Sequence, residues 1–140
     1  MQRKIIPDVV SGQKLVEMPG SATVFEAAKL MQANGVGSVL VTKDGSLEGI
    51  FTERDMVCRV VARGLAPEET SLDQVMTRKP DTIDANATAI EALRLMQDGG
   101  YRHLPVVQVG KLVGIVSRRD FFGVEKARLD EETSLWEEIG

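Results

Sequence analysis

The sequence predicts a mixed α/β (α+β) fold made of two β-α-β-β-α units, stacked with pseudo-twofold symmetry. Residues 8–56 align with residues 73–121 at a constant offset of 65, with 18 identities in 49 pairs. Chance pairing would give roughly one identity in fifteen to twenty. Each copy also shows the same order of helical spacing and β-branched runs. At 140 residues and 43% hydrophobic side chains, the chain is long enough to bury a core.

The first copy reads as a short strand at 15–18, a helix at 23–34 and a hairpin of strands 38–42 and 47–52. Thr23 and Glu26 form a capping-box pattern at the start of the first helix, and Gly35 ends it. The hairpin turn contains Asp44-Gly45, a strong turn signal. A second helix is expected from about 53 to 63, ended by Gly64.

The second copy repeats this order at 81–84, 88–98, 103–109, 112–117 and 118–128. A segment of turn composition at 64–72 joins the copies. We therefore expect a first repeat over 1–66, a second over 67–128 and an acidic tail over 129–140. Because one copy of about 60 residues buries little surface alone, the two are expected to share a core.

Composition excludes several classes of protein. The net charge of −4 argues against a nucleic-acid partner, which needs a basic face. Residues 1–124 carry 15 basic and 15 acidic side chains, so the surplus lies in the tail, which is either a docked amphipathic helix or a frayed end. With no signal-peptide core or membrane-spanning run and a single cysteine, we expect a cytoplasmic protein with no membrane association.

Each returning strand ends in a hydroxyl residue, with an aspartate three positions later. These pairs are Thr52 with Asp55 and Ser117 with Asp120. One interpretation is structural, because this spacing forms a capping box. The other is functional: free N–H groups bind phosphate, and arginines add charge-assisted hydrogen bonds. A carboxylate nearby suits ribose hydroxyls, so the pattern predicts a nucleoside-phosphate site that includes Arg54, Arg118 and Arg119.

Both copies resemble the cystathionine-β-synthase-type (CBS) domain, over about residues 5–128. The resemblance rests on Gly-hydrophobic-x-Thr/Ser-x-x-Asp in both copies, at Gly49–Asp55 and Gly114–Asp120. The run Tyr101-Arg102-His103-Leu104-Pro105-Val106-Val107 is similar to the His/Arg-x-Pro-Val strand of the family. The leads Asp8-Val9-Val10 and Asp73-Gln74-Val75-Met76-Thr77 fit as well. Such a tandem pair is called a Bateman module.

The resemblance implies a non-enzymatic regulatory module that binds adenosine-containing ligands in clefts between the copies. AMP is the first candidate, followed by ADP, ATP, NAD and S-adenosylmethionine. Asp55 and Asp120 would hold the ribose, and Thr52 and Ser117 would contact ribose or phosphate. The other candidates are the adenine-slot residues Met18, Pro19, Thr82, Ile83 and Asp84, and the strand residues Arg102, His103, Leu104 and Pro105, of which the basic pair would meet phosphate.

The first copy departs from the family pattern. Its equivalent strand reads Gly37-Ser38-Val39-Leu40, without the basic residues or the proline, so we expect two unequal sites. The alternative function is a protein-interaction or scaffold module with vestigial ligand sites. An enzyme is disfavoured because no nucleophile–base pair is visible, and no spacing indicates a metal site. His103 is the only histidine, and a lone histidine is more often a hydrogen-bonded strand residue than a ligand, so that interpretation stands beside the phosphate contact which the resemblance implies.

The remaining expectations concern partners. The apolar faces of the four longer helices exceed what the sheets can cover, and the family usually dimerises through such helices, so we expect a homodimer. About 12 residues follow the second copy, so output is expected through an unidentified effector protein or a dimer rearrangement. Cys58 lies among apolar residues and is expected to be an inert, packed thiol.

Overall fold

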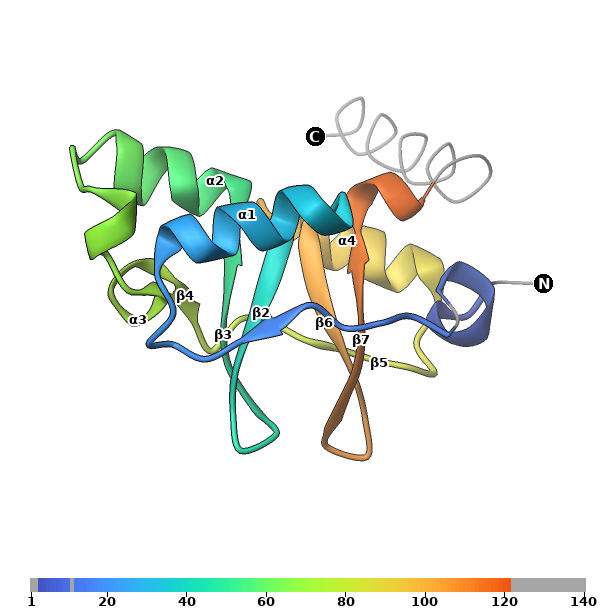
Figure 1. Ribbon diagram of the computed structural model, residues 1–140. Coiled ribbons are helices and arrows are strands. Elements are labelled where there is room, and N and C mark those ends of the chain that lie inside the picture. Colours follow the sequence, from blue (N-terminus) through green and yellow to red (C-terminus); the bar gives the residue numbers. More distant parts are fainter. Residues whose placement is uncertain (1–2, 11, 122–140) are drawn as a thin grey trace, which may run out of the picture. The chain divides into compact units, whose positions relative to one another are not determined.

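The computed structural model describes residues 3–10 and 12–121 and divides into two compact units (Figure 1). One unit is Lys14–Pro80, here called the Asp55 unit. The other combines Met1–Gln13 with Asp81–Gly140 and is called the Asp120 unit.

The Asp55 unit is built on a four-stranded sheet in the order β1-β2-β3-β4. Its strands are β1 (Glu17–Met18), β2 (Ser38–Lys43), β3 (Ser46–Thr52) and β4 (Thr77–Arg78). β1 runs parallel to β2, and the other neighbours are antiparallel. Its helices are α1 (Val24–Asn34), α2 (Glu53–Asp55) with its continuation Met56–Val61, the short turn Pro67–Glu69 and α3 (Leu72–Val75).

Local signals in the sequence correctly mark the ends of these elements. The Glu26 N–H donates to Thr23 Oγ1 at 3.1 Å, which caps the start of α1. Gly35 ends the helix in the left-handed conformation, with φ of 62°. The β2–β3 turn has positive φ at both Asp44 (52°) and Gly45 (81°), as a two-residue hairpin turn requires.

The Asp120 unit holds a three-stranded sheet in the order β5-β6-β7. Its elements are β5 (Ile83–Asp84), α4 (Ala89–Gly99), β6 (His103–Gln108) and β7 (Lys111–Ser117), with helical turns at Ile5–Val9 and Arg118–Asp120. β5 is parallel to β6, and β6 and β7 form the predicted hairpin. Only the first turn of the helix expected at 118–128 falls within the described residues. Its remainder and the tail at 129–140 lie outside them.

The compact units differ from the sequence repeats because the segment that leads into each repeat packs with the other repeat. The segment before the first repeat packs with the second: the Ile5 N–H donates to the Ala87 carbonyl at 2.9 Å. The segment before the second repeat packs with the first: the Leu72 N–H donates to the Ala22 carbonyl at 2.9 Å. β4 then extends the first repeat's sheet. The structural boundaries, near residues 13 and 80, therefore differ from those expected at 66.

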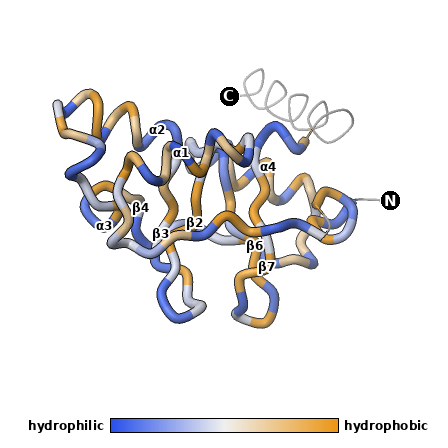
Figure 2. The backbone as a smooth tube through the Cα atoms, viewed as in Figure 1, coloured by the Kyte–Doolittle hydropathy of each residue, from blue (hydrophilic) through white to orange (hydrophobic). Residues whose placement is uncertain are grey.

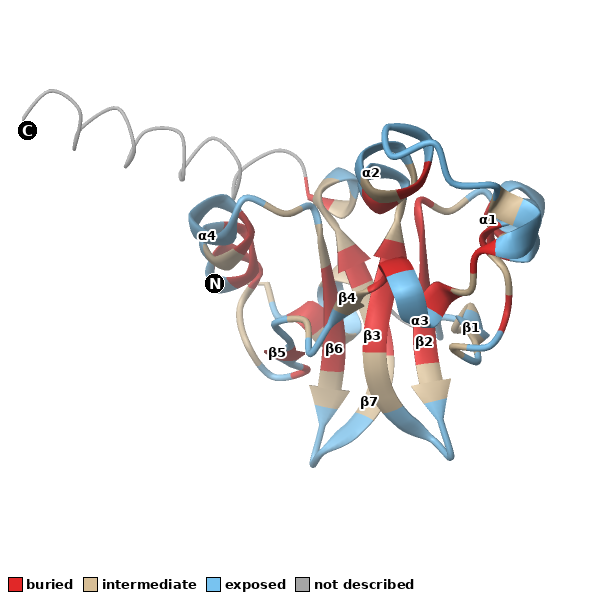
Figure 3. Ribbon diagram, turned by 90° about the vertical axis from the view of Figure 1, so that its left-hand side faces the viewer, coloured by how far each residue is buried: buried red, intermediate tan, exposed pale blue. Residues whose placement is uncertain are grey.

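Each unit has its own hydrophobic cluster. In the Asp55 unit, Val39 and Val41 of β2 and Phe51 of β3 pack with Met31 of α1 and with Val60. In the Asp120 unit, Leu104 and Val116 pack with Leu93 and Met96 of α4 and with Ile5. The hydropathy colouring in Figure 2 follows this pattern, and Figure 3 shows buried hairpin strands with exposed tips. Met31 and Met96 are core residues, as expected.

The expectation that Cys58 is packed is wrong. Cys58 is exposed, whereas Val60, two residues further along the same helix, is fully buried. This segment, Met56–Val61, is a π-helix, and two residues advance it by roughly half a turn, so it presents the thiol on the side opposite Val60. Val57 and Val61 are also exposed.

Candidate functional site

The two hairpins bring the start of one strand beside the end of the next. In the Asp55 unit, Ser38 pairs with Thr52, and the Glu53 N–H donates to the Gly37 carbonyl at 3.0 Å. In the Asp120 unit, His103 pairs with Ser117, and the Arg118 N–H donates to the Arg102 carbonyl at 2.8 Å. The strand expected to meet phosphate therefore lies directly beside the turn that carries the aspartate.

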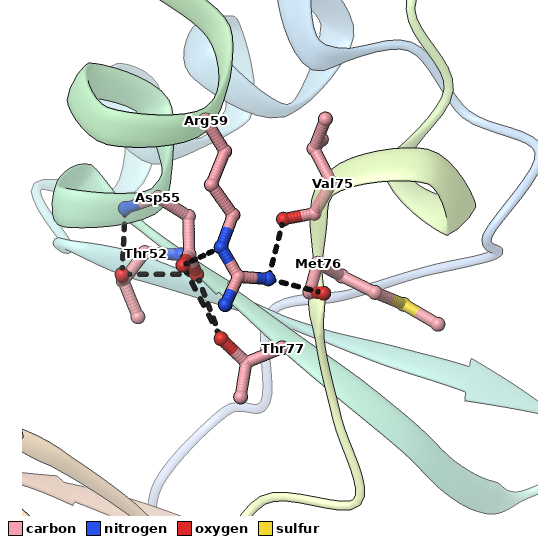
Figure 4. Close-up of polar contacts among 6 residues, drawn as sticks. All are labelled: Thr52, Asp55, Arg59, Val75, Met76 and Thr77. Atoms are coloured by element: carbon pink, nitrogen blue, oxygen red, sulfur yellow. Dashed lines mark hydrogen bonds and ion pairs between the residues drawn. The ribbon is translucent and has the colours of Figure 1, made fainter.

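The Asp55 carboxylate is buried and held by its own chain (Figure 4). Asp55 Oδ2 accepts from the Thr52 N–H at 3.0 Å and lies 3.1 Å from Thr52 Oγ1. Thr77 Oγ1 donates to Asp55 Oδ1 at 3.2 Å. The Arg59 guanidinium lies one helical turn further on, with Nε 3.6 Å from Asp55 Oδ1. These contacts use both carboxylate oxygens.

Arg59 also fixes the chain that leads into β4. Its Nη1 donates to the Met76 carbonyl at 2.9 Å and to the Val75 carbonyl at 3.3 Å. One side chain thus joins the helix after Asp55 to the C-terminal end of α3, as Figure 4 shows. Because Thr77 follows directly, Arg59 and Thr77 hold Asp55 from two elements.

Both aspartates form the capping box that the sequence pattern predicts. The Asp55 N–H donates to Thr52 Oγ1 at 3.2 Å, reciprocating the Thr52 N–H bond to the carboxylate. In the Asp120 unit, the Ser117 N–H donates to Asp120 Oδ2 at 2.7 Å, and Ser117 caps the Asp120 backbone in return. The structural interpretation of the pattern is therefore confirmed in both units.

Four basic residues lie at the Asp120 end of β6 and β7. Arg102 directly precedes β6, His103 begins it, and Arg118 and Arg119 follow β7. Arg102 and Arg119 are exposed, and Arg118 is half-buried. In the Asp55 unit the same positions hold Gly37, Ser38, Glu53 and Arg54. The two sequence-predicted sites thus have similar backbone geometry and different charge.

Several predicted site residues lie away from these strand ends. Met18 pairs with Val41 of β2, whereas Thr52 pairs with Ser38 of the same strand. Val41 and Ser38 are three residues apart, so Met18 and Thr52 lie about 10 Å apart along the strand direction. Pro19 follows it and is exposed. In the Asp120 unit, Ile83 and Leu104 belong to the hydrophobic cluster.

Three further residues have placements set by β5 and β6. The Asp84 carboxylate accepts from the Asn86 N–H at 2.8 Å and so supports the turn after β5. Pro105 is buried within β6, and Thr82, directly before β5, is exposed. The residues that the fold clearly brings together are therefore the hydroxyl–aspartate pairs and the basic positions beside Asp120.

Tyr101 directly precedes Arg102, and its side chain is hydrogen-bonded to the segment just before β5. Its phenol donates to Asp81 Oδ2 at 2.5 Å. Burial, the hydrogen bond to Asp81 and the negative charges of Asp81 and Asp98 raise the pKa of Tyr101 well above its ordinary value of 10.0. The neutral phenol is the form that this contact stabilises.

Sequence reasoning missed Arg59 and Thr77 as partners of Asp55. Arg59 stands four residues after Asp55, a helical spacing that favours an ion pair, so a signal for it was present. Thr77 is 22 residues away and reaches Asp55 only through the pairing of β3 with β4.

Within residues 3–10 and 12–121, no three His, Cys, Asp or Glu side chains are grouped closely enough to hold a metal ion. Over the same described part of the chain, no helix is long and apolar enough to cross a membrane.

Comparison with known proteins agrees with this architecture. The family model for the CBS domain matches residues 8–61 and 72–126. The CBS domain-containing protein CBSCBSPB3 of Arabidopsis thaliana is 39% identical over 104 residues, covering 74% of this chain but only 19% of that protein.

Solved structures add two similar folds. The CBS domain protein PAE2072 of Pyrobaculum aerophilum, complexed with AMP, has a TM-score of 0.78 and 26% identity, covering 94% of this chain and 98% of that one. The hexameric CBS-CP12 protein of bloom-forming cyanobacteria has a TM-score of 0.78 and 29% identity, with 86% and 70% covered.

Proposed function

Because this chain belongs to the CBS-domain family and carries two copies of the domain, a regulatory module, we propose that it is a non-enzymatic sensor of adenosine-containing ligands. AMP is the first candidate, and ADP, ATP, NAD and S-adenosylmethionine are the others. The proposal places the sensor in the cytoplasm, with its output passing to a partner protein or through a rearrangement between subunits.

One observation supports this proposal: the pairing of β6 with β7 places the positions of Arg102, His103, Arg118 and Arg119 at the same end of the hairpin as Ser117 and Asp120. Guanidinium groups suit phosphate oxygens, and a carboxylate suits the two hydroxyls of a ribose. A nucleoside monophosphate presents both groups a few ångströms apart. The AMP complex of PAE2072, whose fold is similar, supports AMP as the first ligand to test.

Thermal denaturation with each of the five ligands tests the proposal. A ligand at 100 times its Kd stabilises the folded state by about 2.7 kcal/mol, which for a chain of this size raises the Tm by several degrees. Guanosine monophosphate at the same concentration is the matched control for base recognition. No response to any adenosine ligand would favour the scaffold alternative, and turnover of ATP or NAD by homogeneous protein would establish an enzyme instead.

We also propose that the chain self-associates through the helices of the Asp55 unit. The large hydrophobic side chains exposed on and after these helices are Phe25 (44%), Val57 (60%), Val61 (65%) and Leu65 (40%). Such residues favour burial against another apolar surface. Light scattering should show a homodimer or a larger closed assembly, and Val57→Glu with Val61→Glu should give a monomer. A wild-type monomer at high micromolar concentration would refute this part of the proposal.

A further inference from the structure

We infer that the two aspartates are not equivalent: Asp55 is held internally by Arg59 and Thr77, and the adenosine ligand is taken at the Asp120 end alone. This inference rests on the proposed function and goes beyond it by assigning the site and the number of ligands per chain.

Both carboxylate oxygens of Asp55 already have partners within the protein. Asp55 meets the Thr52 N–H and hydroxyl, the Thr77 hydroxyl and the Arg59 guanidinium, at distances of 3.0 to 3.6 Å. A ribose that used this carboxylate would have to displace Thr77 or Arg59. Displacing Arg59 would also break its bonds to the Val75 and Met76 carbonyls. Because each lost buried hydrogen bond costs free energy, the internal partners compete directly with a ligand.

Different residues occupy the positions equivalent to Thr77 and Arg59. At the offset of 65, Thr77 corresponds to Gly12 and Arg59 corresponds to Val124. Neither a glycine nor a valine has a side-chain donor for a carboxylate. Val124 lies outside the described residues. The residues that hold Asp55 thus correspond to residues without side-chain donors in the unit that contains Asp120.

The aligned positions of the two repeats also differ in charge. In the second repeat, Arg102, Arg118 and Arg119 accompany one aspartate, Asp120, so these four positions sum to a formal charge of +2. In the Asp55 unit, the equivalent strand start is the uncharged Gly37-Ser38, and Glu53 faces solvent directly before Arg54. With Arg54 and Arg59 against Glu53 and Asp55, that end is formally neutral. An anionic nucleotide is therefore attracted to the Asp120 end and gains little at the Asp55 end.

Calorimetric titration with AMP tests the assignment. The expected result is one AMP per chain, with at least a tenfold loss of affinity in Asp120→Asn. Thr77→Val, which alters only the surroundings of Asp55, is the matched control and should leave the affinity for AMP unchanged. Circular dichroism should confirm that both variants are folded.

The outcomes separate this inference from the proposed function. Two equal AMP sites per chain, or unchanged binding by Asp120→Asn, would overturn the inference and leave the sensor function standing. No binding of AMP or the other adenosine ligands to the wild type would overturn both.

A ligand-free measurement tests the holding of Asp55 separately. In a double-mutant cycle of Asp55→Ala and Arg59→Ala, urea unfolding should reveal a coupling of about threefold in the unfolding equilibrium constant, as is typical of a partly exposed ion pair. If the effects of the two substitutions on the unfolding equilibrium constant are simply additive in free energy, the role given to Arg59 is refuted.

Discussion

The contact of Gly49 with β4 allows a sharp comparison between the two repeats. Gly49 lies in β3 opposite Arg78, and a Cβ atom there would lie 2.7 Å from Met76 Sδ and 2.8 Å from the Thr77 carbonyl oxygen. Met76 is a buried core residue, and pairing with β3 fixes the Thr77 carbonyl. Gly49→Ala therefore forces β4 away from β3.

The equivalent glycine of the second repeat provides the matched control. A Cβ on Gly114 would meet Gln13 Oε1 at 2.9 Å, and its next neighbour, Val106 Cβ, lies at 3.7 Å. Gln13 is exposed and its amide pairs with the backbone of Ile115, so the end of one flexible side chain can move aside. The loss of that contact is partly offset, because alanine restricts the unfolded chain more than glycine does.

The two substitutions should therefore differ in their effect on the free energy of unfolding. Overpacking against a fixed backbone atom typically costs 1–3 kcal/mol, so we expect Gly49→Ala to destabilise by about 2 kcal/mol. Gly114→Ala should change stability by less than about 1 kcal/mol. Urea unfolding followed by circular dichroism gives both values. The Lys79 N–H donates to the Glu48 carbonyl at 3.2 Å, so hydrogen exchange should show faster exchange of this amide in Gly49→Ala alone. Equal stability of the two variants would refute the reasoning.

Other substitutions should have separable effects. Asp55→Ala should lower the free energy of unfolding by about 2–4 kcal/mol, because it removes a cap and leaves the partly buried donors of Thr52, Thr77 and Arg59 without their acceptor. Asp120→Ala should cost about 1 kcal/mol as the loss of a cap, and equal losses in urea titrations would contradict this ranking. Because the pKa of Tyr101 is raised in the folded protein, the unfolded chain loses its phenolic proton at a lower pH than the folded chain does. The free energy of unfolding should therefore fall as pH rises above about 10. Tyr101→Phe should reduce that fall, and an unchanged alkaline slope would count against the contact with Asp81. Gly99→Ala should destabilise by about 1–3 kcal/mol, because a Cβ there would clash with the Tyr101 ring at Cε1; wild-type unfolding in this variant would show that the ring moves freely.

Much of the fold was predictable from local sequence signals. Asp44-Gly45 predicted the first hairpin turn, and Thr23 with Glu26 predicted the start of α1, because both signals act through hydrogen bonds or φ angles within a few residues. The hydroxyl–aspartate pattern also predicted the capping boxes for the same reason. Cys58 was misjudged because its neighbours in sequence are apolar, while the direction of a helical side chain depends on which stripe the core covers.

The sequence by itself determined the duplicated architecture, the hairpins, the caps and the basic composition of the second repeat. Only the tertiary structure decided which leading segment joins which repeat, and with it that Thr77 reaches Asp55. Pairing of β3 with β4 depends on contacts between residues far apart in the chain, which no local pattern specifies. The two aspartates, which look equivalent in the motif, therefore differ in their surroundings, since Asp55 meets donors from a distant strand and Asp120 lies beside its own repeat's arginines.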